Sequence, residues 1–162
     1  NFPKKIIKKI NKNEKLLLVN NQVGTPNHAE FISNVTIKIL KKIINTKLNP
    51  EILNISARGE INYYNFAKKI YKKIKNRKKN SELIPIKLED YKKISQNKKT
   101  AQRPLNSLLN INKLEKFLKL RMPNWESIFE RKIKSIIKKY TKKFIYFLFI
   151  ASFKSLLISK LE

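Results

Sequence analysis

The chain has 162 residues, a formal net charge of +27 at pH 7 and no cysteine. This length suits one domain with one core, and the lack of cysteine excludes a disulfide framework, a thiol nucleophile and a thiolate metal site. Because His28 is the sole histidine, metal sites with two or more histidine ligands are excluded as well.

The positive charge comes almost wholly from lysine, since only five of the 38 basic residues are arginine. Base readout and bidentate phosphate contacts depend largely on arginine, so we expect no specific nucleic-acid partner and only weak, nonspecific RNA binding. Lys, Ile and Asn all have AT-rich codons, and their abundance is typical of genome bias.

The start of the chain shows no signal-peptide pattern, and the predicted location is the cytoplasm.

The first predicted elements are a helix over residues 2–11 and a strand over Leu16–Val19. A polar turn follows and leads into a long amphipathic helix from about Ala29 to Ile44, whose apolar stripe includes Leu40 and Ile44. We expect Asn27 to cap this helix, with Glu30 three residues later as the capping-box partner.

The turn over residues 20–30 has the most distinctive sequence in the chain. It holds Gly24, one of two glycines in the chain, followed by Pro26. A strand, a rigid turn and a helix in this order place polar groups at the carboxyl end of a strand, where α/β proteins bind ligands. A plain strand-to-helix connection is the competing interpretation.

The middle of the chain predicts two more strands and three helices. Ile52–Ser56 is apolar on both faces, which suits a buried parallel strand, and Leu83–Ile86 suits an edge strand because it contains Pro85. The expected helices are Tyr63–Lys75 with Asn62 as cap, a short one over residues 89–94, and one over residues 113–118 capped by Asn112.

The last amphipathic helix opens at Pro123-Asn124-Trp125, and a different kind of sequence follows it. Residues 140–162 contain the apolar run Phe144–Ile150, about half the length of a membrane span, which Lys154 ends before a further apolar stretch. A helix that packs on a partner or a degenerate extension is favoured for this tail over a membrane-surface anchor. We therefore divide the chain into residues 1–139 and a tail over 140–162.

The sequence lacks the motifs on which several familiar catalytic systems depend. Two glycines cannot make the Gly-rich loop of a dinucleotide fold or a phosphate loop. The pairs Tyr64/Lys68 and Tyr71/Lys75 have the Tyr-x-x-x-Lys spacing of short-chain dehydrogenases, but in so lysine-rich a chain we interpret them as solvated helix faces. No catalytic residue, cofactor-binding residue or metal ligand is assigned.

Five motifs, in order over residues 1 to about 138, give the chain a family resemblance to dTDP-4-dehydrorhamnose reductase, a branch of the extended short-chain dehydrogenases. The first, Asn21-Gln22-Val23-Gly24-Thr25-Pro26, is similar to the family's D-Q-x-G-x-P. The others are Tyr64-x-Phe66-Ala67, Ile84-Pro85-Ile86, Arg103-Pro104-x-Asn106-Ser107-x-Leu109 and Leu120-x-Met122-Pro123-Asn124-Trp125.

The resemblance implies an α/β fold in which short, partly parallel strands and helices form the substrate-binding half of a Rossmann-type reductase. The family uses NADPH or NADH to reduce the 4-keto group of dTDP-4-dehydro-L-rhamnose to dTDP-L-rhamnose. Its dinucleotide-binding half, with the catalytic Tyr and Lys, would lie upstream of Asn1, so we expect this chain alone to be inactive. The expected partners are a dTDP-sugar and that Rossmann half, and a homodimer is one assembly that the resemblance allows.

By the same resemblance, Gln22, Gly24, Thr25 and Pro26 would face the sugar-nucleotide pocket. Arg103 and Asn106 would meet the diphosphate or order the turn. Departures from the family include Asn21, which stands where Asp is usual. The alternatives are a non-catalytic binding or regulatory module, a degenerate remnant on the same scaffold, and a basic protein that associates with membranes or RNA.

Overall fold

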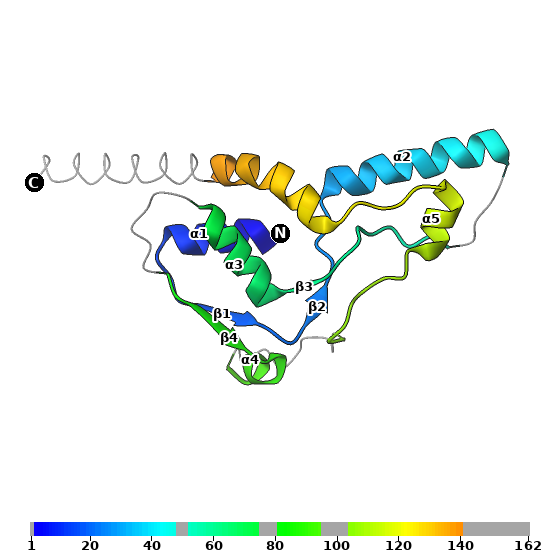
Figure 1. The fold of residues 1–162 in the computed structure, drawn as a ribbon. Coiled ribbons are helices and arrows are strands. Elements are labelled where there is room, and N and C mark those ends of the chain that lie inside the picture. Colours follow the sequence, from blue (N-terminus) through cyan, green and yellow to red (C-terminus); the bar gives the residue numbers. More distant parts are fainter. Residues whose placement is uncertain (1, 48–51, 75–80, 95–103, 141–162) are drawn as a thin grey trace, which may run out of the picture.

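The computed structural model describes residues 2–47, 52–74, 81–94 and 104–140 (Figure 1). The predicted Arg103 and nearly all of the tail lie outside these ranges. Residues 125–140 are helical and are called the C-terminal helix below. The other elements are α1 (Phe2–Asn11), β1 (Leu16–Val19), β2 (Val23–Gly24), α2 (Ala29–Thr46), β3 (Ile61–Asn62), α3 (Tyr63–Lys73), β4 (Leu83–Ile86), α4 (Leu88–Ile94) and α5 (Asn112–Leu118).

Two small strand pairs organise the described residues. β1 and β4 are parallel, with Leu16 opposite Leu83 and Leu18 opposite Pro85. β2 and β3 are antiparallel, with Val23 opposite Asn62. The mixed α/β fold with short parallel strands is therefore confirmed, and the strands predicted at residues 16–19 and 83–86 form its parallel pair.

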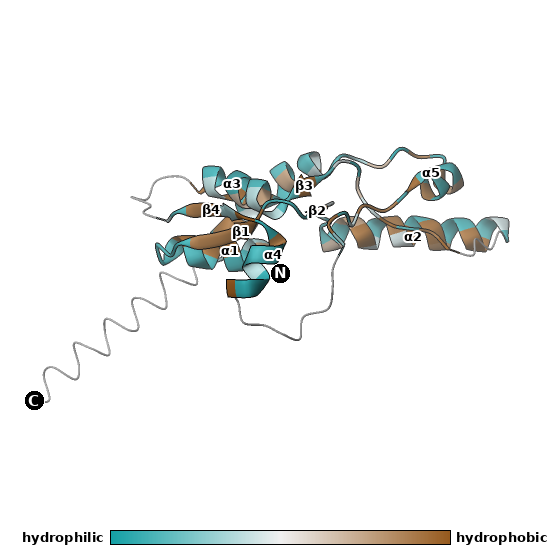
Figure 2. Ribbon diagram, turned by 90° about the horizontal axis from the view of Figure 1, so that it is seen from below, coloured by the Kyte–Doolittle hydropathy of each residue, from teal (hydrophilic) through white to brown (hydrophobic). Residues whose placement is uncertain are grey.

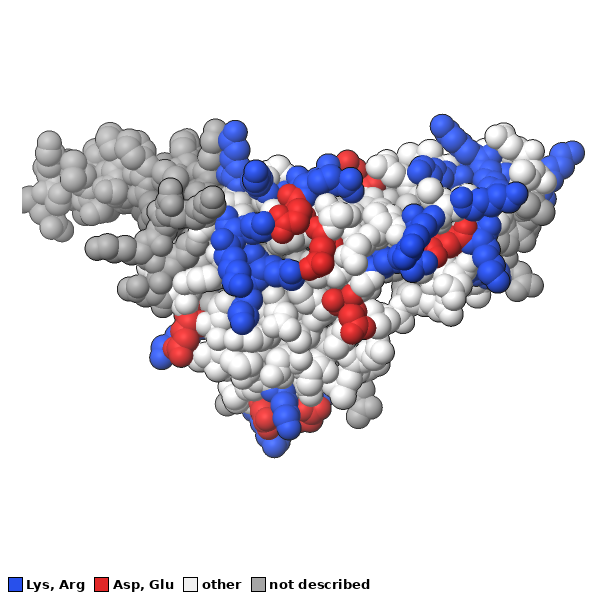
Figure 3. All heavy atoms as spheres, viewed as in Figure 1, with Lys and Arg blue, Asp and Glu red and all other residues white. Residues whose placement is uncertain are grey.

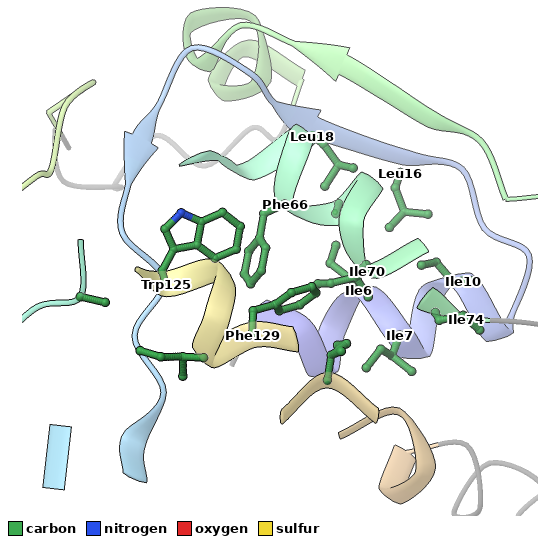
Figure 4. Packing of buried hydrophobic residues seen from close by; sticks show 14 residues of the cluster. Ile6, Ile7, Ile10, Leu16, Leu18, Phe66, Ile70, Ile74, Trp125 and Phe129 are labelled. Atoms are coloured by element: carbon green, nitrogen blue, oxygen red, sulfur yellow. The ribbon is translucent and has the colours of Figure 1, made fainter. Parts of the chain in front are cut away.

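The main core lies where α1, α3 and the C-terminal helix meet beside β1 (Figure 4). Phe66 stands at its centre, with its ring 5.6 Å from Trp125 and 5.5 Å from Phe129 in edge-on arrangements. Such aromatic pairs stabilise a core by about 0.5–1.5 kcal/mol beyond their area burial. α1 contributes Ile6, Ile7 and Ile10, all almost completely buried, which confirms the helix spacing of the first segment.

A second apolar cluster holds α2 against α5, and we call these two helices the α2–α5 arm. Val35 and Ile39 of α2 are buried against Leu114 of α5, and the Lys42 ammonium group donates to the Phe117 carbonyl. Figures 1 and 2 both show the arm standing apart from the β1–β4 pair. The main core and this cluster meet through Phe31, which packs against both.

Two expectations about this region are wrong. Ile52–Ser56 is not a strand: in the described part of the chain these residues pair with no other strand, and Ile52 is 72% exposed. A parallel strand needs a neighbour, and the described residues supply none. The apolar stripe of α2 is also narrower than expected, because Leu40 and Ile44 are exposed rather than buried.

The remaining helices are close to expectation. α3 begins after Asn62, whose side-chain oxygen accepts from the Asn65 amide at 2.8 Å, as predicted for a cap. α4 begins one residue earlier than predicted. Asn112 is the first residue of α5 rather than its cap, and its amide donates to the Asn110 side chain. Within the described ranges no helix combines the length and apolar character needed to cross a membrane.

Candidate functional site

The turn after β1 is held from both sides. On one side β2 pairs with β3, and on the other the Val23 amide donates to the Leu105 carbonyl at 2.7 Å. Gln22 is 7% exposed, and its side-chain amide donates to the Pro104 carbonyl at 3.1 Å. The side-chain amide of Gln22 is thus engaged inside the protein, where it fixes the turn to the segment over residues 104–107.

Thr25 links this turn to a second one. Its hydroxyl group donates to the Gly59 carbonyl at 2.7 Å. Gly24 is less constrained than the sequence suggested, because its φ is not positive and a Cβ atom there would lie 3.9 Å from Ser107, an ordinary contact. The turn therefore does not depend on a glycine at position 24.

The second glycine, Gly59, occupies a position that favours glycine. Its φ is +84°, and a Cβ atom would come within 2.9 Å of the Asn124 side chain and 3.0 Å of the Trp125 ring. Both the φ and the close approach favour glycine. The close approach of Gly59 to Trp125 joins residues that are far apart in the chain.

Arg58 anchors this second turn. Its Nε donates to Glu115 Oε1 at 2.8 Å, and a second guanidinium nitrogen pairs with Glu115 Oε2. The hydrogen bond from Arg58 lowers the pKa of the Glu115 carboxyl group, with a further lowering from the Met122 amide. Backbone bonds then join Arg58 to Pro123 and Trp125, so the turn ties α5 to the start of the C-terminal helix.

The start of α2 corrects the capping prediction. His28, not Asn27, is the N-cap, and its Nδ1 accepts from the Glu30 amide. The Asn27 side chain instead accepts from the Ala57 amide at 2.8 Å and donates to the Ser56 hydroxyl at 3.2 Å. Asn27 therefore crosslinks the turn to the extended segment, a contact that local sequence does not reveal.

Glu30 is not a capping-box partner either. Its carboxylate lies 2.7 Å from the Lys132 ammonium group of the C-terminal helix. The hydrogen bond from Lys132 is the largest cause of a lowered Glu30 pKa. This exposed ion pair bridges α2 and the C-terminal helix at one edge of the pocket described next.

A pocket of about 750 Å³ opens beside the turn. Part of its lining is the run from Gln22 to Ala29, and side chains from α1, α3 and the C-terminal helix, aromatic and polar ones among them, form most of the rest. Its aromatic members include the Phe66, Trp125 and Phe129 rings seen in Figure 4, together with Phe2 and Tyr63. The polar members on the C-terminal helix include Lys132, Ser135 and Lys139.

The pocket brings together four of the six residues proposed from the sequence: Gln22, Gly24, Thr25 and Pro26 line it. Asn106 does not, because its side-chain oxygen accepts from the Leu108 amide at 2.9 Å and orders its own segment. The neighbouring Ser107 lines the pocket and was not singled out. Its position beside Gly24 follows from the pairing of residues 104–107 with β2.

The described ranges also bear on metal binding and on the two Tyr-x-x-x-Lys pairs. No cluster there has three or more His, Cys, Asp or Glu side chains placed to hold a metal ion. Lys68 lies 5.4 Å from the centre of the Tyr64 ring, so it stacks on the ring, as on an ordinary helix face. Lys75, the partner in the second Tyr-x-x-x-Lys pair, is outside the described residues.

Comparisons with known proteins agree with this architecture. The family model described as the RmlD substrate binding domain matches residues 1–141. A dTDP-4-dehydrorhamnose reductase of Sinorhizobium fredii is 30% identical over 139 residues, which are 85% of this chain and 45% of the relative. The reductase of Escherichia coli is 24% identical over 128 residues, or 78% of this chain and 41% of that protein.

Solved structures give the same result. The dTDP-4-dehydrorhamnose reductase of Bacillus anthracis, crystallised in complex with NADP, superposes with a TM-score of 0.64 at 29% identity, covering 81% of this chain and 42% of that one. The Clostridium acetobutylicum reductase, at 21% identity and a TM-score of 0.63, shares the fold and covers 84% of this chain and 44% of that one. The chain spans less than half the length of these relatives, and it belongs to the RmlD substrate binding domain family.

Proposed function

We propose that this chain is the substrate-binding part of a reductase that uses NADPH or NADH to convert dTDP-4-dehydro-L-rhamnose to dTDP-L-rhamnose. The observation that carries the proposal is the pocket beside the Gln22–Pro26 turn, in a chain that matches the family over residues 1–141. The curated relatives that it matches bear the name of this reductase.

The dinucleotide would be bound by another part of the enzyme. The residues of this chain do not fit it, because two glycines cannot build the Gly-rich loop that a dinucleotide pyrophosphate requires. We therefore place the cofactor and the catalytic acid on an upstream Rossmann half, and we expect the 162-residue chain alone to be inactive.

The role left to this chain is to bind and orient the sugar nucleotide. The turn would do so with Gly24, Thr25 and Pro26, while Gln22 holds the turn in place through its bond to the Pro104 carbonyl and Asn106 orders the segment over residues 104–108. Arg103 is kept as a candidate for the diphosphate, since guanidinium groups bind phosphates bidentately. The aromatic wall and Lys132 and Lys139 suit a ligand with a flat base and negative charge.

The test is an assay of the protein assembled with its dinucleotide-binding half. We expect NADPH oxidation that depends on dTDP-4-dehydro-L-rhamnose, and no oxidation by the 162-residue chain alone. A matched pair of variants probes the turn: Ser107→Trp fills the pocket and should abolish turnover, whereas Leu108→Trp on the exposed side of the same segment should retain it. An assembly that does not oxidise NADPH with this sugar would contradict the proposal.

The second candidate is a binding module without turnover. The pocket is present although the chain contains no Gly-rich loop, and this favours binding over chemistry for the polypeptide by itself. Tight binding of dTDP-L-rhamnose by a native protein that has no upstream half would support this candidate over the reductase.

A further inference from the structure

A second cavity, of about 440 Å³, lies between the β2–β3 pair and one face of α3. Its volume falls in the range of about 300–1,000 Å³ that is typical of small-molecule sites. The polar residues that line it are Glu60, Asn62, Asn65, Lys68, Lys69 and Lys72. The last four have the i, i+3, i+4, i+7 spacing of one helix face. α3 turns a different face, with Tyr63 and Phe66, to the pocket beside the turn, so the proposed function gives these four side chains no role.

Two of the three lysines that line this cavity have no ionic partner among the described residues. Lys69 donates to Glu126 at 2.5 Å, whereas Lys68 and Lys72 pair with no carboxylate there. Lys68 instead lies 5.4 Å from the centre of the Tyr64 ring. Like charges four residues apart on a helix repel each other, so an anion bound between Lys68 and Lys72 would relieve this repulsion.

This arrangement differs from that of the other lysines on the nearby helices. Lys69 and Lys73, the adjacent row on α3, each lie 2.5 Å from a glutamate carboxylate of the C-terminal helix. In Figure 3, Lys and Arg side chains gather over α3, with acidic side chains beside them. The exposed lysines of α1, such as Lys5, line neither of the two cavities. Protein carboxylates thus neutralise one lysine row of α3, and the second row is left to frame a cavity.

Amide groups add further donors to this cavity. The Asn62 side-chain oxygen caps α3 by accepting from the Asn65 amide at 2.8 Å, which leaves the Asn62 side-chain nitrogen to donate. Ammonium and amide nitrogens both donate to phosphate oxygens, and the charged donors form the stronger bonds. We infer that this cavity is a second ligand site, which binds a phosphorylated small molecule with its phosphate at Lys68 and Lys72. Because Glu60 repels phosphate, the uncharged part of the molecule, with hydroxyl groups to donate, would lie on its side of the cavity.

The test uses the protein assembled with its dinucleotide-binding half, and inorganic pyrophosphate is the probe. Isothermal titration calorimetry should show saturable binding, and the double variant Lys68→Gln plus Lys72→Gln should weaken it at least about tenfold, because two charge-assisted bonds are lost. The matched control is Lys5→Gln plus Lys8→Gln, which removes the same charge from the exposed face of α1 and should change the dissociation constant less than about twofold. Acetylation of the wild-type protein, followed by peptide mass spectrometry, gives a second readout: pyrophosphate should slow the modification of Lys68 and Lys72 but not of Lys5 and Lys8.

Val23, Ile61 and Asn62 line both cavities, so a competition experiment is needed to separate the two sites. Pyrophosphate binding that survives saturation with dTDP-L-rhamnose supports a separate site, whereas binding that disappears would overturn the inference. A lack of saturable binding, or equal losses in the two double variants, would overturn it as well, because only the net charge would then matter. A short RNA tests the other source of phosphate: we expect both double variants to weaken RNA binding equally. A greater loss for Lys68→Gln plus Lys72→Gln would show that this face binds an RNA backbone instead. Loss of keto-sugar reduction with pyrophosphate binding intact would reject the proposed function alone.

Discussion

At the scale of single residues, Gly59 constrains the fold more than Gly24 does. Gly59→Ala should lower the free energy of unfolding by about 1–3 kcal/mol, because alanine at a φ of +84° is strained and its Cβ would approach Asn124 and Trp125. Gly24→Ala is the matched control, since its Cβ would meet only an ordinary contact with Ser107. Urea unfolding measures both, and equal stabilities for the two variants would show that the Gly59 geometry is not required.

The Arg58–Glu115 ion pair should give the protein a characteristic acid response. The Glu115 pKa is lowered from 4.5 in the folded state, so the stability that the pair contributes is present above pH 4.5 and is lost as the pH falls through the folded value. Glu115→Gln should therefore lower stability at pH 7 and flatten the loss of stability below pH 4.5.

The control for that experiment is Glu60→Gln, which removes an exposed carboxylate next to the same turn. It should keep the wild-type acid transition in unfolding experiments followed by Trp125 fluorescence. If Glu115→Gln showed the same slope as the wild type below pH 4.5, the ion pair would not couple protonation to folding.

At the scale of elements, the start of α2 depends on a contact distant in sequence. Asn27→Ala should cost about 1–3 kcal/mol, because it leaves the Ala57 amide without the acceptor that it now has. His28→Ala removes only a 3.3 Å capping bond at an exposed position and should cost less. Thermal unfolding of the two variants gives the comparison, and a larger loss for His28→Ala would reverse our assignment of their roles.

The same elements show what local sequence can predict. The helix at residues 2–11, the strands at 16–19 and 83–86, and the cap at Asn62 follow from spacing and side-chain chemistry within a few residues, and all were predicted correctly. The cap of α2 was not, because Asn27 is engaged by Ala57, thirty residues away. Residues 52–56 have the pattern of a strand, but a pattern cannot supply the neighbour that a strand needs.

Part of the candidate site could also be predicted from the sequence. Gln22, Gly24, Thr25 and Pro26 were found from their motif, and they line one pocket. Ser107 and the Arg58–Gly59 turn were missed as site or support residues, because their roles come from pairing with β2 and from contact with Trp125. The positions of such residues depend on tertiary contacts rather than on local pattern.

Asn21 shows that a departure from the family pattern can have a structural role. Its side-chain oxygen accepts from the Leu88 amide at 2.9 Å at the start of α4, while its nitrogen donates to Glu89 at 3.2 Å. An aspartate here would place a second carboxylate against Glu89, so asparagine suits this neighbour. This contact argues against the view that the change is simple decay.

At the scale of the whole molecule, the charge of +27 should dominate contacts with polyanions. We expect RNA to bind without sequence preference and to lose most of its affinity, by a factor of about 10³ or more, between 50 and 200 mM salt. Fluorescence anisotropy with two unrelated RNAs of equal length measures this. Affinity that persisted at the higher salt for one RNA alone would indicate a specific nucleic-acid site, contrary to what so few arginines predict.

The central claim is that this chain holds the sugar nucleotide at the turn over residues 22–26, and hydrogen exchange of the assembled protein with and without dTDP-L-rhamnose tests it most directly. We predict slower exchange for amides in residues 22–26 and 61–63, which line the pocket, with no change in α4. Protection confined to residues outside the pocket, at a ligand concentration that saturates binding, would contradict this claim.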